Sequence, residues 1–125
     1  NAKRDWGFAG DYVQAMWMML QQEKAQDFVI ATGENHSVAE FAQEAFKVIG
    51  ISNWEKYVKS SKEFMRPAEV DLLIGDPTKA KEKLGWESEY DLKGLVNDMM
   101  EGDLRLMKKE QFLKENGYST LNYFE

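Results

Sequence analysis

The sequence predicts a small domain of mixed α/β class that is mostly helical and carries a few short strands. Three observations predict it: apolar residues recur at helical spacing in several stretches, short apolar runs bounded by glycine separate them, and the length of 125 residues suits one domain. With 43% hydrophobic and 13% aromatic residues, the chain has enough apolar material to fold around one core. Residues 1–125 are therefore expected to form a single domain.

The first part of the chain is predicted to fold as helix, strand, helix. In residues 9–22 apolar side chains recur at helical spacing while glutamines occupy the other side. Residues 27–32 contain a compact apolar run that a glycine ends, which is typical of a buried strand. Ser37 and Glu40 have the spacing of a capping box, and the helix that they open is expected to end at Gly50.

The middle of the chain, residues 51–75, has no clear periodicity. A short strand is expected at residues 56–60, and Pro67 favours an extended backbone for the residue before it. Because irregular segments often carry binding residues, this stretch is a candidate binding loop.

The last part is predicted to contain three helices. Asp76 and Pro77 are read as the N-cap and first residue of a short helix that Gly85 ends. From Asp91 a long amphipathic helix is expected, followed by a separate partner helix at residues 108–115.

Composition excludes several classes of function. Sixteen basic and twenty-two acidic residues give a net charge of −6, which repels a nucleic-acid backbone. The chain has no cysteine, so disulfides and cysteine-metal sites are excluded, and it has no signal peptide and no apolar run near the roughly 20 residues that span a bilayer. A cytoplasmic protein that binds neither nucleic acid nor membrane is expected.

No catalytic or metal-binding group is expected on this chain. His36 is the single histidine, which leaves a transition-metal site without its usual ligands, and the interpretation is that it orders the turn before Ser37. Glycine-rich G-x-G-x-x-G turns and Tyr-x-x-x-Lys pairs are both absent from the sequence.

Two arginines stand in turn-like stretches, Arg4 near the beginning and Arg66 directly before Pro67. A guanidinium is a planar fork of donors that binds phosphate oxygens in pairs, so two of them could clamp a diphosphate. The alternative is structural: Arg4 precedes Asp5, and Arg66 precedes Glu69 by three residues, so both could tie loops down with ion pairs.

Several stretches occur together in a specific order. They are Arg4-Asp5-Trp6-Gly7, residues 27–34, residues 36–38, Arg66-Pro67-Ala68-Glu69-Val70-Asp71, Gly75-Asp76-Pro77-Thr78-Lys79-Ala80-Lys81 and Leu84-Gly85-Trp86. By them the chain resembles the extended short-chain dehydrogenase/reductase family of sugar-nucleotide enzymes, and within it the GDP-mannose 4,6-dehydratase group. The resemblance covers nearly the whole chain, and Phe8 departs from it because a histidine is expected there.

The resemblance implies that only the carboxyl-terminal, substrate-binding part of such an enzyme is represented. A missing amino-terminal Rossmann domain would hold NADP and the catalytic residues, so this fragment is expected to bind no cofactor and to be inactive alone. Asn1-Ala2 is interpreted as the remnant of a purification tag. An apolar face left without the missing domain is expected to favour homo-oligomers.

The same resemblance implies a binding site for GDP-mannose. Arg4 and Arg66 would face its two phosphates, and Glu69 would accept hydrogen bonds from the ribose diol or from the amino edge of guanine. Glu69 as an ion-pair partner of Arg66 stays open. So do two other functions: an epimerase or dehydratase acting on another sugar nucleotide, and a stand-alone nucleotide-binding module.

Overall fold

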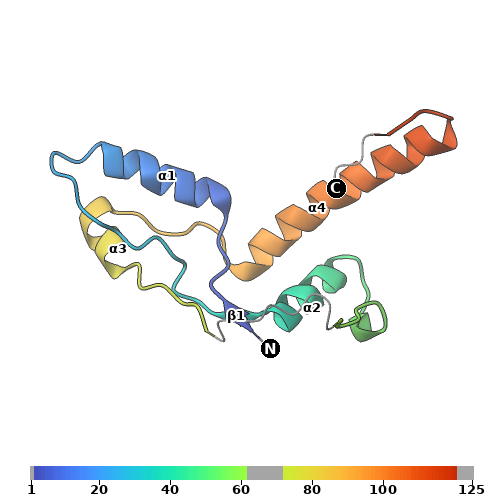
Figure 1. Ribbon diagram of the computed structural model, residues 1–125, viewed down its shortest axis with the longest axis horizontal. Coiled ribbons are helices and arrows are strands. Elements are labelled where there is room, and N and C mark those ends of the chain that lie inside the picture. Colours follow the sequence, from blue (N-terminus) through green and yellow to red (C-terminus); the bar gives the residue numbers. More distant parts are fainter. Residues whose placement is uncertain (1, 62–71, 121–125) are drawn as a thin grey trace.

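The computed structural model describes residues 2–61 and 72–120, which form helices joined by irregular segments and one small sheet (Figure 1). The elements in chain order are β1 (Lys3–Arg4), α1 (Ala9–Leu20), β2 (His36–Ser37), α2 (Val38–Val48), η1 (Trp54–Lys56), α3 (Thr78–Leu84) and α4 (Leu92–Glu115). The predicted class, a small, mostly helical mixed domain, is confirmed.

The sheet joins the beginning of the chain to its middle. β1 and β2 are antiparallel, with Lys3 opposite Ser37 and Arg4 opposite His36. On its other side Lys3 forms a parallel bridge with Leu72, and the Leu73 N–H donates to the Lys3 carbonyl at 3.3 Å. Neither strand was predicted, because a two-residue strand is too short to produce an alternating pattern.

The first core cluster lies between α1 and α3. Ala15 of α1, Ala80 of α3 and Trp86 are almost fully buried. The Trp86 indole Nε1 donates to the Asp11 carbonyl at 2.9 Å, so the buried polar end of this side chain has a partner. Six half-buried apolar side chains complete the cluster: Tyr12, Met18, Met19, Phe28, Ile30 and Leu84.

A second group of buried residues lies at the beginning of α4, where this helix packs against α2 (Figure 1). Leu92, Leu95 and Val96 are buried there. From this point α4 extends away from the other helices (Figure 1). Trp6 and Phe41 of α2 pack with their ring centroids 4.7 Å apart, which joins α2 to the segment after β1.

Helix ends agree well with the sequence predictions. The Ser37 hydroxyl accepts from the Glu40 N–H at 3.1 Å, and the Glu40 carboxylate accepts from the Ser37 N–H at 2.6 Å, which confirms the capping box. Asp91 caps α4 by accepting from the Gly94 N–H at 2.7 Å. Gly85 ends α3 with φ of 70°, a left-handed conformation that favours glycine.

Asp76 does not have the predicted position at the beginning of α3. Pro77 is the N-cap and Thr78 the first helical residue, so the expected boundary is one residue early. Asp76 still accepts from the Thr78 N–H at 2.9 Å, because an Asp side chain readily closes a turn on the amide two residues ahead.

Two predicted strands are wrong. Residues 27–32 form no strand. Side chains bind the two ends of this segment instead: the Lys79 ammonium donates to the Asp27 carbonyl, and the Thr32 N–H donates to the Asp5 carboxylate. Residues 56–60 form no strand either, because the Tyr57 N–H donates to the Trp54 carbonyl at 2.9 Å and closes the 3₁₀ turn η1.

The predicted division of the last helix is also wrong, because α4 runs without a break from Leu92 to Glu115. No proline interrupts it, and Gly102 in its interior weakens it by only about 1 kcal/mol relative to alanine. The predicted end is correct: Gly117 follows with φ of 77°. Within the ranges that the structure describes, no helix combines the length and apolar character needed to cross a bilayer.

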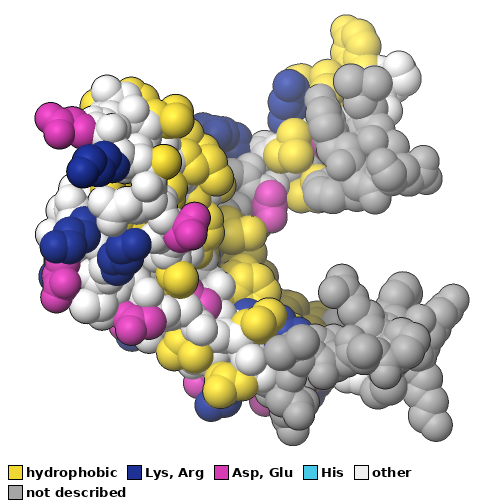
Figure 2. Space-filling model, turned by 60° about the vertical axis from the view of Figure 1, so that its left-hand side comes forward, with side chains coloured by type: hydrophobic (Ala, Val, Ile, Leu, Met, Phe, Trp, Pro, Cys, Tyr) yellow, Lys and Arg dark blue, Asp and Glu magenta, His cyan; other side chains and the backbone are white. Residues whose placement is uncertain are grey.

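Large apolar side chains are exposed on one face of α1, and Figure 2 shows hydrophobic patches on the surface of the molecule. The exposed fractions on α1 are Val13 63%, Met16 59%, Trp17 62% and Leu20 81%. Their spacing of three, four and seven residues places them in one stripe along the helix, which we call the α1 stripe. An apolar stripe of this kind is typical of a surface that meets a partner.

The capping box predicts how stability depends on pH. The hydrogen bonds that Glu40 makes with the backbone and side chain of Ser37 lower its pKa. Because the folded-state pKa lies below the ordinary value, the ionised Glu40 stabilises the fold at neutral pH. This contribution is lost as the pH falls from the ordinary glutamate value through the lowered one.

The variant Glu40→Gln tests this contribution, because glutamine keeps the cap but has no titration. We expect the wild type to be more stable than the variant at pH 7, and the difference in free energy of unfolding to shrink as the pH falls through the lowered pKa of Glu40. Urea unfolding at a series of pH values measures it. Parallel pH profiles for the two proteins would contradict the assignment.

Candidate functional site

Arg4 lies in β1, and its half-buried side chain lines a cavity of about 280 Å³. One guanidinium nitrogen, Nη1, donates to the Lys3 carbonyl at 2.7 Å. The remaining walls come from segments distant in sequence: Asp5, Tyr12, residues 29–31 and residues 73–75. The structure therefore brings together one of the predicted binding residues and a cavity.

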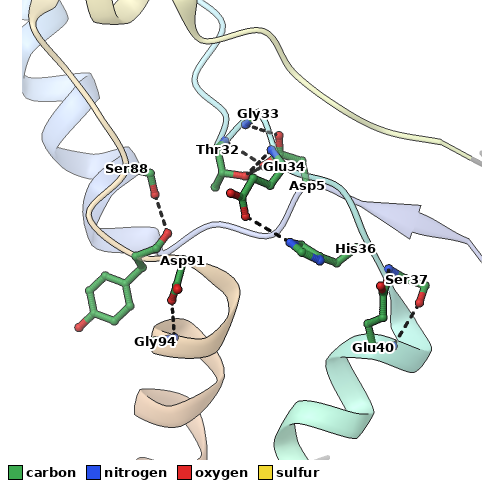
Figure 3. Close-up of polar contacts among 11 residues, drawn as sticks. Asp5, Thr32, Gly33, Glu34, His36, Ser37, Glu40, Ser88, Asp91 and Gly94 are labelled. Carbon is green, nitrogen blue, oxygen red and sulfur yellow. Dashed lines mark hydrogen bonds and ion pairs between the residues drawn. The ribbon is translucent and has the colours of Figure 1, made fainter.

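Asp5 connects the segments that line the Arg4 cavity through hydrogen bonds to its carboxylate (Figure 3). Its Oδ1 accepts from the Thr32 N–H at 2.9 Å and from the Thr32 hydroxyl at 2.7 Å, and its Oδ2 accepts from the Gly33 N–H at 3.0 Å. The Gly75 N–H also lies 3.4 Å from Oδ2. The Asp5 carboxylate thus joins its own segment to residues 32–33 and to Gly75.

Gly75 is needed where these segments meet. A Cβ atom at this position would lie only 2.3 Å from the Cβ of Ala31, a distance that no side chain tolerates. The absence of a side chain lets residues 73–75 approach residues 29–31 closely, and both then line the Arg4 cavity. Asn35 strengthens the junction by donating from Nδ2 to the Leu73 carbonyl at 2.7 Å.

Tyr12 brings a neutral polar group to the Arg4 cavity. Burial raises the pKa of its hydroxyl, and the carboxylates of Asp5 and Asp11 raise it further. The phenol therefore keeps its proton at neutral pH and can donate a hydrogen bond. Gly7 makes room for it, because a Cβ there would lie 2.0 Å from the Tyr12 hydroxyl oxygen.

A second cavity, of about 250 Å³, lies beside Trp6 and the loop before α4. Glu34, Glu89 and Asp91 line it, together with His36, whose Nε2 is 3.3 Å from a Glu34 carboxylate oxygen (Figure 3). The three carboxylates make this cavity acidic, whereas Arg4 and one carboxylate, that of Asp5, line the Arg4 cavity. Among the described residues, no group of three or more acidic, His or Cys side chains is placed to hold a metal ion.

Asp11 positions the loop that lines this second cavity. It is only 3% exposed, and its Oδ2 accepts from the Ser88 hydroxyl at 3.1 Å and from the Glu89 N–H at 3.0 Å. Close by, Phe8 stacks on Tyr90 with ring centroids 4.5 Å apart, so the residue that departs from the family pattern makes an apolar contact.

The other two predicted binding residues, Arg66 and Glu69, lie outside the described residues, as does Asp71. The sequence prediction missed the role of Asp5, which was read only as a salt-bridge partner for a neighbouring arginine. Its hydrogen-bond partners at residues 32, 33 and 75 are mostly backbone amides, which leave no mark in a sequence. A turn with a short acidic side chain was the only available signal.

Comparisons with known proteins give consistent matches. A family model described as GDP-mannose 4,6 dehydratase matches residues 1–99. The chain is 53% identical over 118 residues to GDP-mannose 4,6 dehydratase 2 of Arabidopsis thaliana, and 45% identical over 124 residues to the GDP-mannose 4,6 dehydratase of Homo sapiens. The GDP-mannose 4,6 dehydratase of Dictyostelium discoideum is 50% identical over 124 residues.

These matches cover most of this chain but a minor part of each relative. They include 94%, 86% and 86% of the chain for the Arabidopsis, human and Dictyostelium proteins, and 31%, 33% and 35% of those proteins. The chain thus spans about a third of the length of the relatives that it matches.

Proposed function

The chain belongs to the GDP-mannose 4,6-dehydratase family, and on this premise we propose that it is the substrate-binding part of such an enzyme. The proposed ligand is GDP-mannose, which the whole protein, a lyase, converts to GDP-4-keto-6-deoxymannose. The observation that supports a binding role is the cavity that Arg4 lines together with segments from both halves of the chain. A cytoplasmic setting, expected from the composition, is part of the proposal.

The bridge between Lys3 and Leu72 supports a clamp that includes Arg66. Arg66 precedes Leu72 by six residues in the sequence. Arg4 follows Lys3 directly. We propose that both arginines contact the same diphosphate; Glu69 is three residues before Leu72 in the sequence.

Binding of the diphosphate by two arginines would act on the reaction indirectly. The phosphates do not react, so their contacts with Arg4 and Arg66 orient the sugar relative to the reacting groups. Each charge-assisted hydrogen bond contributes about 1.5–3 kcal/mol to such binding. Glu69 is proposed to add a contact to the ribose or to guanine.

NADP, the cofactor proposed for the whole protein, does not fit the residues of this chain. A dinucleotide site needs a glycine-rich turn between a strand and a helix, with a pattern such as G-x-G-x-x-G. The sequence contains no such pattern. We therefore place the cofactor on a Rossmann domain outside this chain, together with the catalytic residues, and expect this chain to be inactive alone.

Calorimetric titration of the chain with GDP, UDP and inorganic pyrophosphate tests the proposal. Binding of GDP that is tighter than binding of UDP and pyrophosphate supports a guanine-nucleotide site. Equal weak binding of all three would favour a general diphosphate clamp and would support the alternatives of another sugar nucleotide or a stand-alone module. Failure of all three to bind would overturn the proposal that this chain carries the site.

The α1 stripe is proposed to pack against the remaining part of the longer polypeptide. Relatives are about three times as long as this chain, so a large part of a family protein is available to cover it. On the isolated chain, the stripe is expected to pair with a second copy, which would produce a homo-oligomer by burying the same apolar side chains.

The double variant Trp17→Gln with Leu20→Gln tests self-association through this stripe. Burial of one large apolar side chain contributes about 1.5–3 kcal/mol, so the variant is expected to dimerise at least ~10-fold more weakly. Sedimentation velocity over a range of concentrations measures it. Val58→Gln, an exposed apolar residue outside α1, is the control. An equal loss in the control variant would contradict the assignment to α1.

A further inference from the structure

The Asp5 carboxylate connects parts of the chain that are very far apart in sequence. Its partners Thr32 and Gly33 are 27 and 28 positions away, and Gly75 is 70 positions away. Asp5 directly follows Arg4, and Gly75 belongs to the segment that comes after Arg66. The carboxylate therefore lies at the junction between the segment that carries Arg4, residues 32–33 and Gly75.

We infer that Asp5 is a positioning residue for phosphate binding in the Arg4 cavity, holding β1 against residues 32–33 and Gly75 so that Arg4 faces this cavity. This inference rests on the proposed function. Asp5 acts mainly through backbone amides, because it accepts from the N–H groups of Thr32, Gly33 and Gly75, and in addition from the Thr32 hydroxyl. Its contribution to binding is made through the orientation of Arg4.

Electrostatics alone predicts the opposite effect of Asp5. Asp5 and Arg4 line the same cavity, and a carboxylate near a diphosphate repels it. If charge were decisive, removal of the Asp5 charge would tighten phosphate binding. If position is decisive, the same change weakens binding, so the sign of the effect separates the two explanations.

Asparagine is the informative replacement because it has nearly the same shape. Its carbonyl oxygen can still accept from Thr32. Its NH₂ group replaces Oδ2, however, and cannot accept from the Gly33 N–H or the Gly75 N–H. In Asp5→Asn, the side-chain NH₂ group would therefore face the N–H groups of Gly33 and Gly75, so that donors meet donors. The variant also removes the negative charge.

The test measures GDP and guanosine binding by calorimetry in four proteins: wild type, Asp5→Asn, Arg4→Ala and the double variant. We expect Asp5→Asn to weaken GDP binding at least ~10-fold. Guanosine, which has no phosphate, should bind within about 2-fold of the wild type. In the Arg4→Ala background, Asp5→Asn should change GDP affinity less than ~3-fold, because Asp5 acts through Arg4.

Unchanged or tighter GDP binding by Asp5→Asn would overturn the inference, and so would an equal loss for GDP and guanosine. Absence of GDP binding by the wild type would overturn the proposed function itself, which keeps the two failures distinct.

Thr32→Val is a second variant in case Asp5→Asn does not fold. It keeps the charge and removes the 2.7 Å hydrogen bond from the Thr32 hydroxyl to Asp5 Oδ1, together with the 3.1 Å hydrogen bond that this hydroxyl accepts from the Glu34 N–H. We expect Thr32→Val to weaken GDP binding about 2–5-fold while Thr32→Ser stays near the wild type, and equal affinities for both would overturn the inference.

Discussion

Replacement of Arg4 by alanine is expected to weaken GDP binding to this chain by about 10–100-fold. Arg4 lines the cavity between β1 and residues 73–75, and its guanidinium would make charge-assisted hydrogen bonds to the diphosphate. Arg4→Lys should lie between the wild type and Arg4→Ala, because lysine keeps the charge but has no planar fork of donors. Titration calorimetry with GDP measures all three affinities.

Arg105→Ala is the matched control, since Arg105 is exposed on α4 and carries the same charge. It should leave GDP affinity within about 2-fold of the wild type, because isolated surface charges are screened by salt beyond about 10 Å. Arg66→Ala is expected to behave like Arg4→Ala. Equal losses of GDP affinity in Arg4→Ala and Arg105→Ala would show that only net charge matters. That result would contradict the role assigned to Arg4.

Replacement of Trp86 by alanine is expected to lower the free energy of unfolding by about 3–5 kcal/mol. The side chain is 2% exposed and packs between Ala15 of α1 and Ala80 of α3. Its removal also leaves the Asp11 carbonyl without the indole N–H donor. Urea unfolding followed by circular dichroism measures the loss.

Two variants separate the contributions to this loss. Trp86→Phe keeps most of the apolar volume but removes the hydrogen bond to Asp11, so it should be less destabilising than Trp86→Ala. Trp17→Ala, on the exposed stripe of α1, should change stability by less than about 1 kcal/mol. A similar loss for Trp17 and Trp86 would show that the α1–α3 cluster is not the core of the fold.

The elements predicted correctly from sequence are those that local interactions specify. The capping box of Ser37 and Glu40 and the cap by Asp91 involve residues three positions apart, so a short stretch contains the whole signal. The glycine that ends α3 is likewise decided by backbone conformation at one residue. Such features survive in any tertiary context.

The strand predictions failed because a strand is specified by its partner. Residues 27–32 have the composition of a strand, yet side chains of Lys79 and Asp5 bind its ends where a ladder would be needed. Conversely β1 and β2 are too short to be visible in the sequence and exist because their backbones pair with each other. Long-range pairing of this kind cannot be read from a local pattern.

For the site, the sequence predicted three binding residues, and the structure describes the surroundings of one of them, Arg4. Arg4 was recognisable as a donor fork in a turn, but its cavity depends on residues 29–31 and 73–75, which only folding brings near it. Asp5 was visible as an acidic residue. Its function as a junction depends on amides up to 70 positions away.

The bridge between Lys3 and Leu72 has a consequence for the folding reaction. Closing a loop of about 70 residues is entropically costly and slow, so this junction is expected to form late, after the helices. The Arg4 cavity would then exist only in fully folded molecules. A bound nucleotide would therefore raise the melting temperature of the whole chain in proportion to the logarithm of its concentration, which makes thermal melting a sensitive assay for ligands of this protein.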